Sequence, residues 1–131
     1  MCNIYIYYSI KSYNNGDPEV TLRGEIIKNT GHNIIIRDSD GYEQIIPMYN
    51  IVAIVYDGNY IETSYELKPV YVYYSAKAYD HSKPEIEFNG KLQTINENNI
   101  VVTGEQGLIH IISTFPIIAF VHEGGTHYEI K

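Results

Sequence analysis

The side chains best suited to binding a ligand lie in two nearly identical segments, YIYYSIKSY at residues 5–13 and YVYYSAKAY at residues 71–79. If each segment is a β-strand, alternate residues share one face, because successive side chains of a strand point to opposite sides. One face then carries three tyrosines, a serine and a lysine, the same in both segments. These ten residues, here called the Tyr/Lys residues, are Tyr5, Tyr7, Ser9, Lys11, Tyr13, Tyr71, Tyr73, Ser75, Lys77 and Tyr79.

These residue types favour a small planar, anionic ligand of the nucleotide kind. Tyrosine rings stack on planar groups, and a lysine ammonium attracts an anion. Two equivalent sites per chain would follow. The alternative is that the Tyr/Lys residues form a contact between the two halves of the chain or between chains, where tyrosine is also favoured. The two roles can coexist, because ligand sites often lie at domain interfaces.

An internal repeat surrounds the two segments. With an offset of 66 residues, positions 5–62 align with positions 71–128 without a gap, and 18 of the 58 pairs are identical. The identities include glycines and small residues, such as Gly24 with Gly90 and Ala53 with Ala119. This predicts two copies of one fold, residues 1–66 and 67–131, joined so closely that they should touch.

Each copy has the pattern of short strands separated by Gly, Asn and Asp turns, and no segment has a helical period. The strands predicted in the first copy are 4–12, 19–28, 33–37, 42–46 and 51–56. Those predicted in the second copy are 70–78, 85–93, 99–103, 108–112 and 117–122. The predicted fold class is therefore all-β, with two tandem homologous small five-stranded barrels that pack closely together.

A glycine in the second strand of each copy, Gly24 or Gly90, is expected to let that strand bend, as a small barrel requires in order to close. This bent strand, two short hairpin strands, the tight turn in YNIVAIV and a closing strand resemble the small barrels of the Sm-like and SH3-like superfolds. The resemblance covers nearly all of both copies and implies that each copy folds as a small β-barrel. Sm-like proteins commonly form rings and bind RNA, and SH3-like proteins commonly bind peptides.

Few residues point to catalysis or to a metal. His122, Glu123 and His127 are close in the sequence, but the histidines are five apart around a Gly-Gly pair, whereas a zinc-protease helix needs a spacing of four. Cys2 is the only cysteine, and no serine lies in a Gly-flanked elbow. We therefore expect no metal site, no cofactor and no enzymatic activity.

Composition and charge limit the classes of binding partner that we expect. A net charge of -7 and a pI near 5.1 argue against binding to duplex DNA, which depends on Lys and Arg displacing counterions. One cysteine excludes an intramolecular disulfide, and no stretch approaches the roughly 20 apolar residues of a membrane span. The expectation is a cytoplasmic protein of a bacterium or of an infected bacterial cell.

The function that the sequence favours is non-enzymatic sequestration of a nucleotide-like ligand by the Tyr/Lys residues, as in a phage counter-defence protein. Two other functions stay open. One is a protein-interaction adaptor or inhibitor whose acidic surface meets a basic partner. The other is an Sm-like RNA binder, which the net charge disfavours. Each is compatible with a homo-oligomer.

Overall fold

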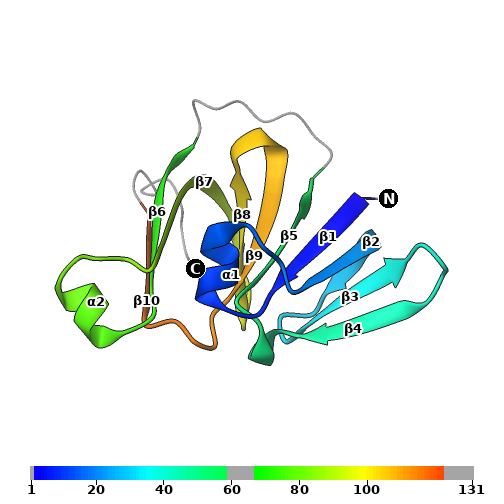
Figure 1. Cartoon of the computed structure of the whole chain (residues 1–131), viewed down its shortest axis with the longest axis horizontal. Helices are drawn as coiled ribbons and strands as arrows, with labels where there is room; N and C mark the ends of the chain where they lie inside the picture. Colours follow the sequence, from blue (N-terminus) through cyan, green and yellow to red (C-terminus); the bar gives the residue numbers. More distant parts are fainter. Residues whose placement is uncertain (1, 59–66, 123–131) are drawn as a thin grey trace.

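The computed structural model of the chain describes residues 2–58 and 67–122 (Figure 1). In these two ranges ten strands form one antiparallel sheet in the order β10-β6-β7-β8-β9-β5-β1-β2-β3-β4. The strands of the first half are β1 (Cys2–Tyr7), β2 (Val20–Asn29), β3 (Asn33–Asp38), β4 (Glu43–Pro47) and β5 (Ala53–Asp57). Those of the second half are β6 (Lys68–Tyr73), β7 (Ile86–Ile95), β8 (Asn99–Gly104), β9 (Leu108–Ser113) and β10 (Ala119–His122).

The helices are short. Among the described residues they are α1 (Ile10–Asn15), α2 (Ala76–Asp80) and the 3₁₀ turns η1 (Met48–Asn50) and η3 (Glu105–Gly107). None of the helices in the described part of the chain is long and apolar enough to cross a membrane.

The prediction of an all-β fold is confirmed, but the prediction of two tandem barrels is not. The sheet is continuous and open, and two separate closed barrels are not confirmed. Within each half the strand order is the same, with the fifth strand beside the first, and the bulge in β2 at Ile26/Lys28 recurs in β7 at Leu92/Thr94. The domain limits 1–66 and 67–131 stay a prediction.

The first predicted strand of each half is wrong beyond its midpoint. Strand β1 ends at Tyr7 and β6 ends at Tyr73, and the residues that were expected to continue them fold into α1 and α2. Consequently the expectation that the chain has no helix is also wrong. The physical reason is the N-cap serine of each helix, Ser9 in α1 and Ser75 in α2, which favours a helix start at this point.

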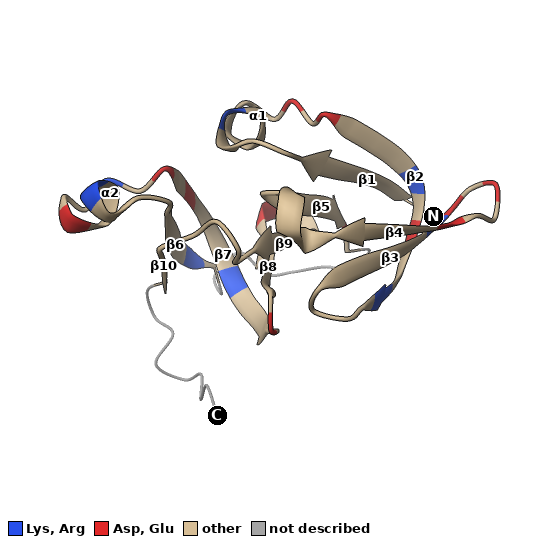
Figure 2. Cartoon of the chain, turned by 90° about the horizontal axis from the view of Figure 1, so that it is seen from below, with Lys and Arg blue, Asp and Glu red and all other residues tan. Residues whose placement is uncertain are grey.

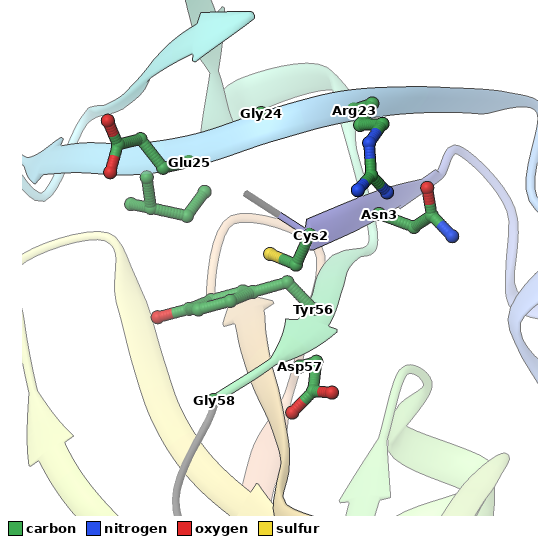
Figure 3. A pocket seen from close by; sticks show the side chains of 9 residues that line it. Cys2, Asn3, Arg23, Gly24, Glu25, Tyr56, Asp57 and Gly58 are labelled. Atoms are coloured by element: carbon green, nitrogen blue, oxygen red, sulfur yellow. The ribbon is translucent and has the colours of Figure 1, made fainter. Parts of the chain in front are cut away.

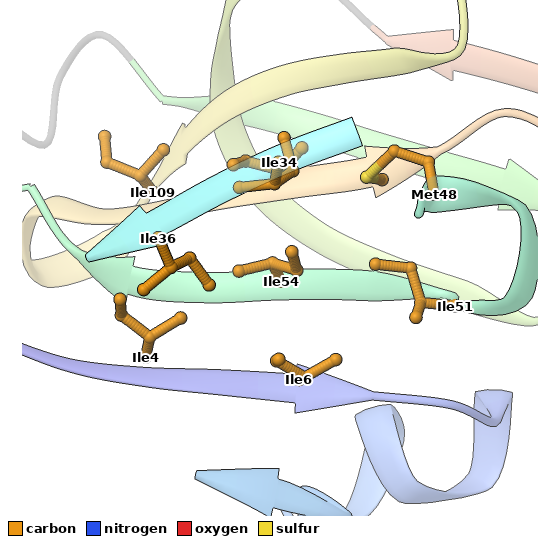
Figure 4. Packing of buried hydrophobic residues seen from close by; sticks show 9 residues of the cluster. Ile4, Ile6, Ile34, Ile36, Met48, Ile51, Ile54 and Ile109 are labelled. Carbon is orange, nitrogen blue, oxygen red and sulfur yellow. The ribbon is translucent and has the colours of Figure 1, made fainter. Parts of the chain in front are cut away.

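The two halves are joined by pairing between β5 and β9, which lie side by side in the middle of Figure 1. This pairing runs from Ala53 opposite Ile112 to Asp57 opposite Leu108. Each hydrophobic core takes residues from both halves as a result. Ile109 and Ile111 of β9 belong to the core of the first half, and Figure 4 shows Ile109 with Ile34 and Ile36. Val52 and Ala53 belong to the core of the second half.

Gly24 in β2 lies where a neighbouring strand passes very close. A Cβ atom at this position would lie 2.3 Å from the backbone oxygen of Arg37 in β3 and 2.9 Å from the Cα of Asp38. The same position in the second half, Gly90, would meet the side chain of Val102 at 2.5 Å. Lack of space beside the neighbouring strand, backbone at Gly24 and the Val102 side chain at Gly90, therefore explains why both halves carry glycine here.

The Gly24→Ala variant should be destabilised by about 1 to 3 kcal/mol, because the added methyl group has to push β2 and β3 apart. The measurement is urea unfolding followed by circular dichroism. Thr21→Ala, at an exposed position of the same strand, is the control and should change the free energy of unfolding much less. Equal stability of Gly24→Ala and wild type would show that β2 and β3 are not this close.

Candidate ligand-binding site

The ten Tyr/Lys residues do not share one face, because each segment changes from strand to helix in its middle. Tyr5 and Tyr71 lie on strands and are half-buried, and Tyr7 and Tyr73 are the buried last residues of β1 and β6. Ser9 and Ser75 are the N-caps of α1 and α2, Lys11 and Lys77 are exposed on these helices, and Tyr13 and Tyr79 also lie on them. Figure 2 shows the basic positions on both helices.

Helix capping explains why both segments keep a serine. The Ser9 hydroxyl accepts a hydrogen bond from the backbone N–H of Ser12 at 3.0 Å, and Ser75 accepts one from Ala78 at 3.1 Å. A serine at this position satisfies an N–H group that has no partner within the helix. In α1 the Ser12 side chain also accepts from the Ser9 backbone N–H at 3.4 Å, which completes a capping box.

A glutamate anchors the turn before each helix. The Glu19 carboxylate accepts hydrogen bonds from the Tyr8 backbone N–H at 2.8 Å and from the Ser12 hydroxyl at 2.9 Å. Glu85 accepts from the Tyr74 N–H at the same distance of 2.8 Å. The Tyr8 hydrogen bond is the main reason why the pKa of Glu19 lies below its usual value. This carboxylate turns the chain out of β1 and stops the strand.

Ring packing explains two of the three tyrosines in each segment. The rings of Tyr7 and Tyr13 meet edge to face at a centroid distance of 5.3 Å, and those of Tyr73 and Tyr79 meet in the same way at 5.2 Å. This geometry is favoured for aromatic pairs because the positive edge of one ring faces the negative face of the other. Each pair fastens a helix to the end of its strand, and burial leaves Tyr7 and Tyr73 little surface for a ligand.

Tyr13 also reaches across to the second half. Its hydroxyl oxygen lies 2.7 Å from Nδ1 of His110 in β9, and the His110 ring stacks on Phe88 at 4.7 Å. Burial raises the pKa of Tyr13 and lowers the pKa of His110 to about 4, so both groups are neutral near pH 7. Tyr13 therefore lies at the contact between the two halves, which is the alternative role considered from the sequence.

A pocket of about 580 Å³ lies elsewhere, where the start of β1, the middle of β2 and the end of β5 come together (Figure 3). None of the Tyr/Lys residues lines it. Its lining residues are Cys2, Asn3, Arg23, Gly24, Glu25, Ile26, Tyr56, Asp57 and Gly58. We call it the Arg23 pocket. The sheet register brings these residues together, because Cys2 pairs with Gly24 and Asn3 with Arg23, while Ile4 pairs with Tyr56.

The Arg23 pocket combines opposite charges with an aromatic ring. Figure 3 shows Arg23 and Asn3 close together at one side, with Glu25 and the Tyr56 hydroxyl towards the other. Arg23 makes no ion pair with any described residue, whereas Glu25 lies 3.8 Å from Arg37. The guanidinium can therefore pair with an incoming anion, and the carboxylates of Glu25 and Asp57 can accept hydrogen bonds.

A second hollow, of about 370 Å³, does include Tyr/Lys residues, because Ser9 and Lys11 line it together with Ser12, Asn15, Asp17, Pro18 and Glu19. Of the residues that the structure describes, none that lines this hollow is aromatic, and two of them, Asp17 and Glu19, are carboxylates beside the lysine. It offers a cation but no surface for stacking. The Arg23 pocket is the better candidate for a planar ligand.

Within residues 2–58 and 67–122 no three His, Cys, Asp or Glu side chains are grouped so that they could hold a metal ion. Glu123 and His127 of the stretch considered above lie outside the described residues. Comparison of the chain with protein-family models, with curated proteins and with solved structures gives no match.

Burial of His110 should make the stability of the protein depend on pH. Well above pH 6.5 the ring is neutral in both the folded and the unfolded chain, whose pKa values are about 4 and 6.5. As the pH falls through this window, only the unfolded chain takes up a proton, so the free energy of unfolding should decrease by up to roughly 3 kcal/mol.

The measurement for this prediction is urea unfolding at a series of pH values between 7 and 4. His110→Gln should remove most of the pH dependence in that window, because glutamine does not titrate. His32→Gln is the matched control, since His32 is exposed and pairs with the exposed Glu97 at 3.2 Å. An unchanged slope in His110→Gln would contradict the burial of this ring.

Proposed function

We propose that this protein is a non-enzymatic binding protein that holds one small, planar, nucleotide-like molecule in the Arg23 pocket. The observation that carries the proposal is the composition of that pocket. Its volume of about 580 Å³ is in the usual range for small-molecule sites, roughly 300 to 1,000 Å³. Its lining includes a guanidinium, an amide, an aromatic ring and two carboxylates, from Arg23, Asn3, Tyr56, Glu25 and Asp57.

Each of these groups matches a part of a nucleotide. Arg23 can meet a phosphate with two parallel hydrogen bonds, a geometry that guanidinium groups favour. Tyr56 is half-buried and offers ring surface to a planar base. Glu25 and Asp57 can accept hydrogen bonds from amino or hydroxyl groups of the ligand.

The two carboxylates modify the ligand class expected from the sequence. They repel a ligand that carries only negative charge, such as inorganic phosphate, because like charges close together disfavour each other. A ligand with an anionic end and several hydrogen-bond donors satisfies both sides of the pocket. Nucleotides have this combination.

One site per chain follows, instead of the two that the repeated segments suggested. At an offset of 66 residues Arg23 is replaced by Asn89, Glu25 by Lys91 and Tyr56 by His122. The second half therefore lacks the guanidinium and the tyrosine. We propose that the two halves are copies of one small barrel-like unit and that only the first copy keeps this ligand site.

The proposal is tested by calorimetry with a panel of nucleotides and cyclic dinucleotides. Arg23→Gln should weaken binding at least about tenfold, because a hydrogen bond to a charged group contributes about 1.5 to 3 kcal/mol. Lys11→Gln makes the same change of charge on α1 and should leave the affinity unchanged. The opposite pattern would return the site to the Tyr/Lys residues, and no binding by any nucleotide would leave the adaptor function as the better explanation.

The rate at which Cys2 reacts with a thiol reagent tests independently where the ligand binds. Cys2 is the only cysteine of the chain and it lines the Arg23 pocket, so its reaction with a thiol reagent reports on this pocket alone. A bound nucleotide should slow the modification of Cys2. Binding by calorimetry without any protection of Cys2 would place the site elsewhere.

A further inference from the structure

The junction between the two halves joins two different strands. It pairs β5, the last strand of the first half, with β9, the fourth strand of the second half. Such a head-to-tail contact uses two unlike surfaces, so it uses up only one surface of each half. The first half keeps its own fourth strand, β4, and the second half keeps its own last strand, β10.

These two remaining strands are the ends of the sheet. In the described part of the chain β4 pairs only with β3, and β10 pairs only with β6 (Figure 1). At the 66-residue offset β4 is the counterpart of β9, and β10 is the counterpart of β5. One molecule therefore presents, at opposite ends, the two strand types that already pair with each other in its middle.

Side chains that the junction buries are exposed at the free ends. Ile111 of β9 is 2% exposed, but its counterpart Ile45 on β4 is 61% exposed. Val55 of β5 is 5% exposed, whereas Val121 on β10 is 38% exposed. Before the last strand of each half, Val52 is 7% exposed and Ile118 is 55% exposed. The free ends thus leave apolar residues in water that the same pairing would cover.

The tyrosine pairs show the same difference. Tyr13 is enclosed by Phe88 and His110 of the other half, whereas its counterpart Tyr79 is 51% exposed and packs against Tyr73. At the same offset the residues that correspond to Phe88 and His110 are Leu22 and Gln44. These lie on β2 and β4, next to the free end of the first half.

We propose that a second copy of this chain occupies the free ends, with β10 of one copy pairing antiparallel with β4 of the next. The internal junction gives the register at the 66-residue offset. The expected partners are Ala119 with Ile46, Phe120 with Ile45, Val121 with Gln44 and His122 with Glu43. Tyr79 then packs over Leu22 and Gln44 of the neighbouring copy.

Two substitutions make this contact weaker than the internal one. In the junction the Ser113 N–H donates to the Val52 oxygen at 3.0 Å, but the counterpart of Ser113 is Pro47, which has no N–H. Tyr56 opposite Ile109 is replaced by His122 opposite Glu43, a polar pair at the rim. Self-association is therefore reversible and depends on protein concentration.

Sedimentation equilibrium of the full chain between about 1 and 200 µM tests the proposal. Wild type should form species whose masses are multiples of the 15.0 kDa chain. Ile45→Lys and Val121→Lys place a charge on each free end and should weaken association at least tenfold, as charged edge strands do. Ile95→Lys, at an exposed position outside both end strands, is the matched control and should associate like wild type.

Mixing the two end variants identifies the head-to-tail arrangement. Ile45→Lys keeps an intact β10 and Val121→Lys keeps an intact β4, so an equimolar mixture should form a dimer of one copy of each, although neither variant alone does. Circular dichroism spectra and melting temperatures check that both variants fold, and Tyr79→Ala gives a second test without an added charge. A wild type that stays at 15.0 kDa throughout, or variants that associate like wild type, would overturn the proposal.

Discussion

The antiparallel pairing of β5 with β9 is the interaction on which the rest of the structure depends. It converts two small units into one sheet, and it lets Ile109 and Ile111 complete the core of the first half while Val52 and Ala53 complete that of the second. Small domains bury only a modest part of their surface when they fold alone. Two halves of 66 and 65 residues gain stability by sharing cores in this way.

Identical residues have different surroundings in the two halves, because the head-to-tail junction buries one end of each half and leaves the other end exposed. Tyr13 is enclosed at the junction and Tyr79 is exposed at an end of the molecule, although both belong to the same repeated segment. Conversely, Asn89 and His122 of the second half stand at the positions of Arg23 and Tyr56, so the guanidinium and the tyrosine that line the Arg23 pocket have no equivalent at these positions. Both halves share one strand order, and under the two proposals the substitutions assign ligand binding to the first half and assembly to the free ends of the sheet.

Strand positions could be predicted from alternation and turn residues, and Ile4 and Ile6 are buried as that pattern requires. The helices α1 and α2 could not be predicted from periodicity, because helices of six and five residues span fewer than two turns. Their signal was instead the cap at Ser9 and Ser75. The Arg23 pocket was missed because Asn3, Arg23 and Tyr56 are far apart in the sequence and meet only through the sheet register.

The most direct test of the shared sheet is a nuclear Overhauser spectrum of the isotopically labelled chain. The account predicts strong cross-strand contacts between backbone protons of residues 53–57 and 108–113, because these strands pair in register. If each half instead closed on itself as a separate barrel, residues 53–57 would show such contacts with residues 43–47. That second pattern, together with no contacts to residues 108–113, would contradict the account.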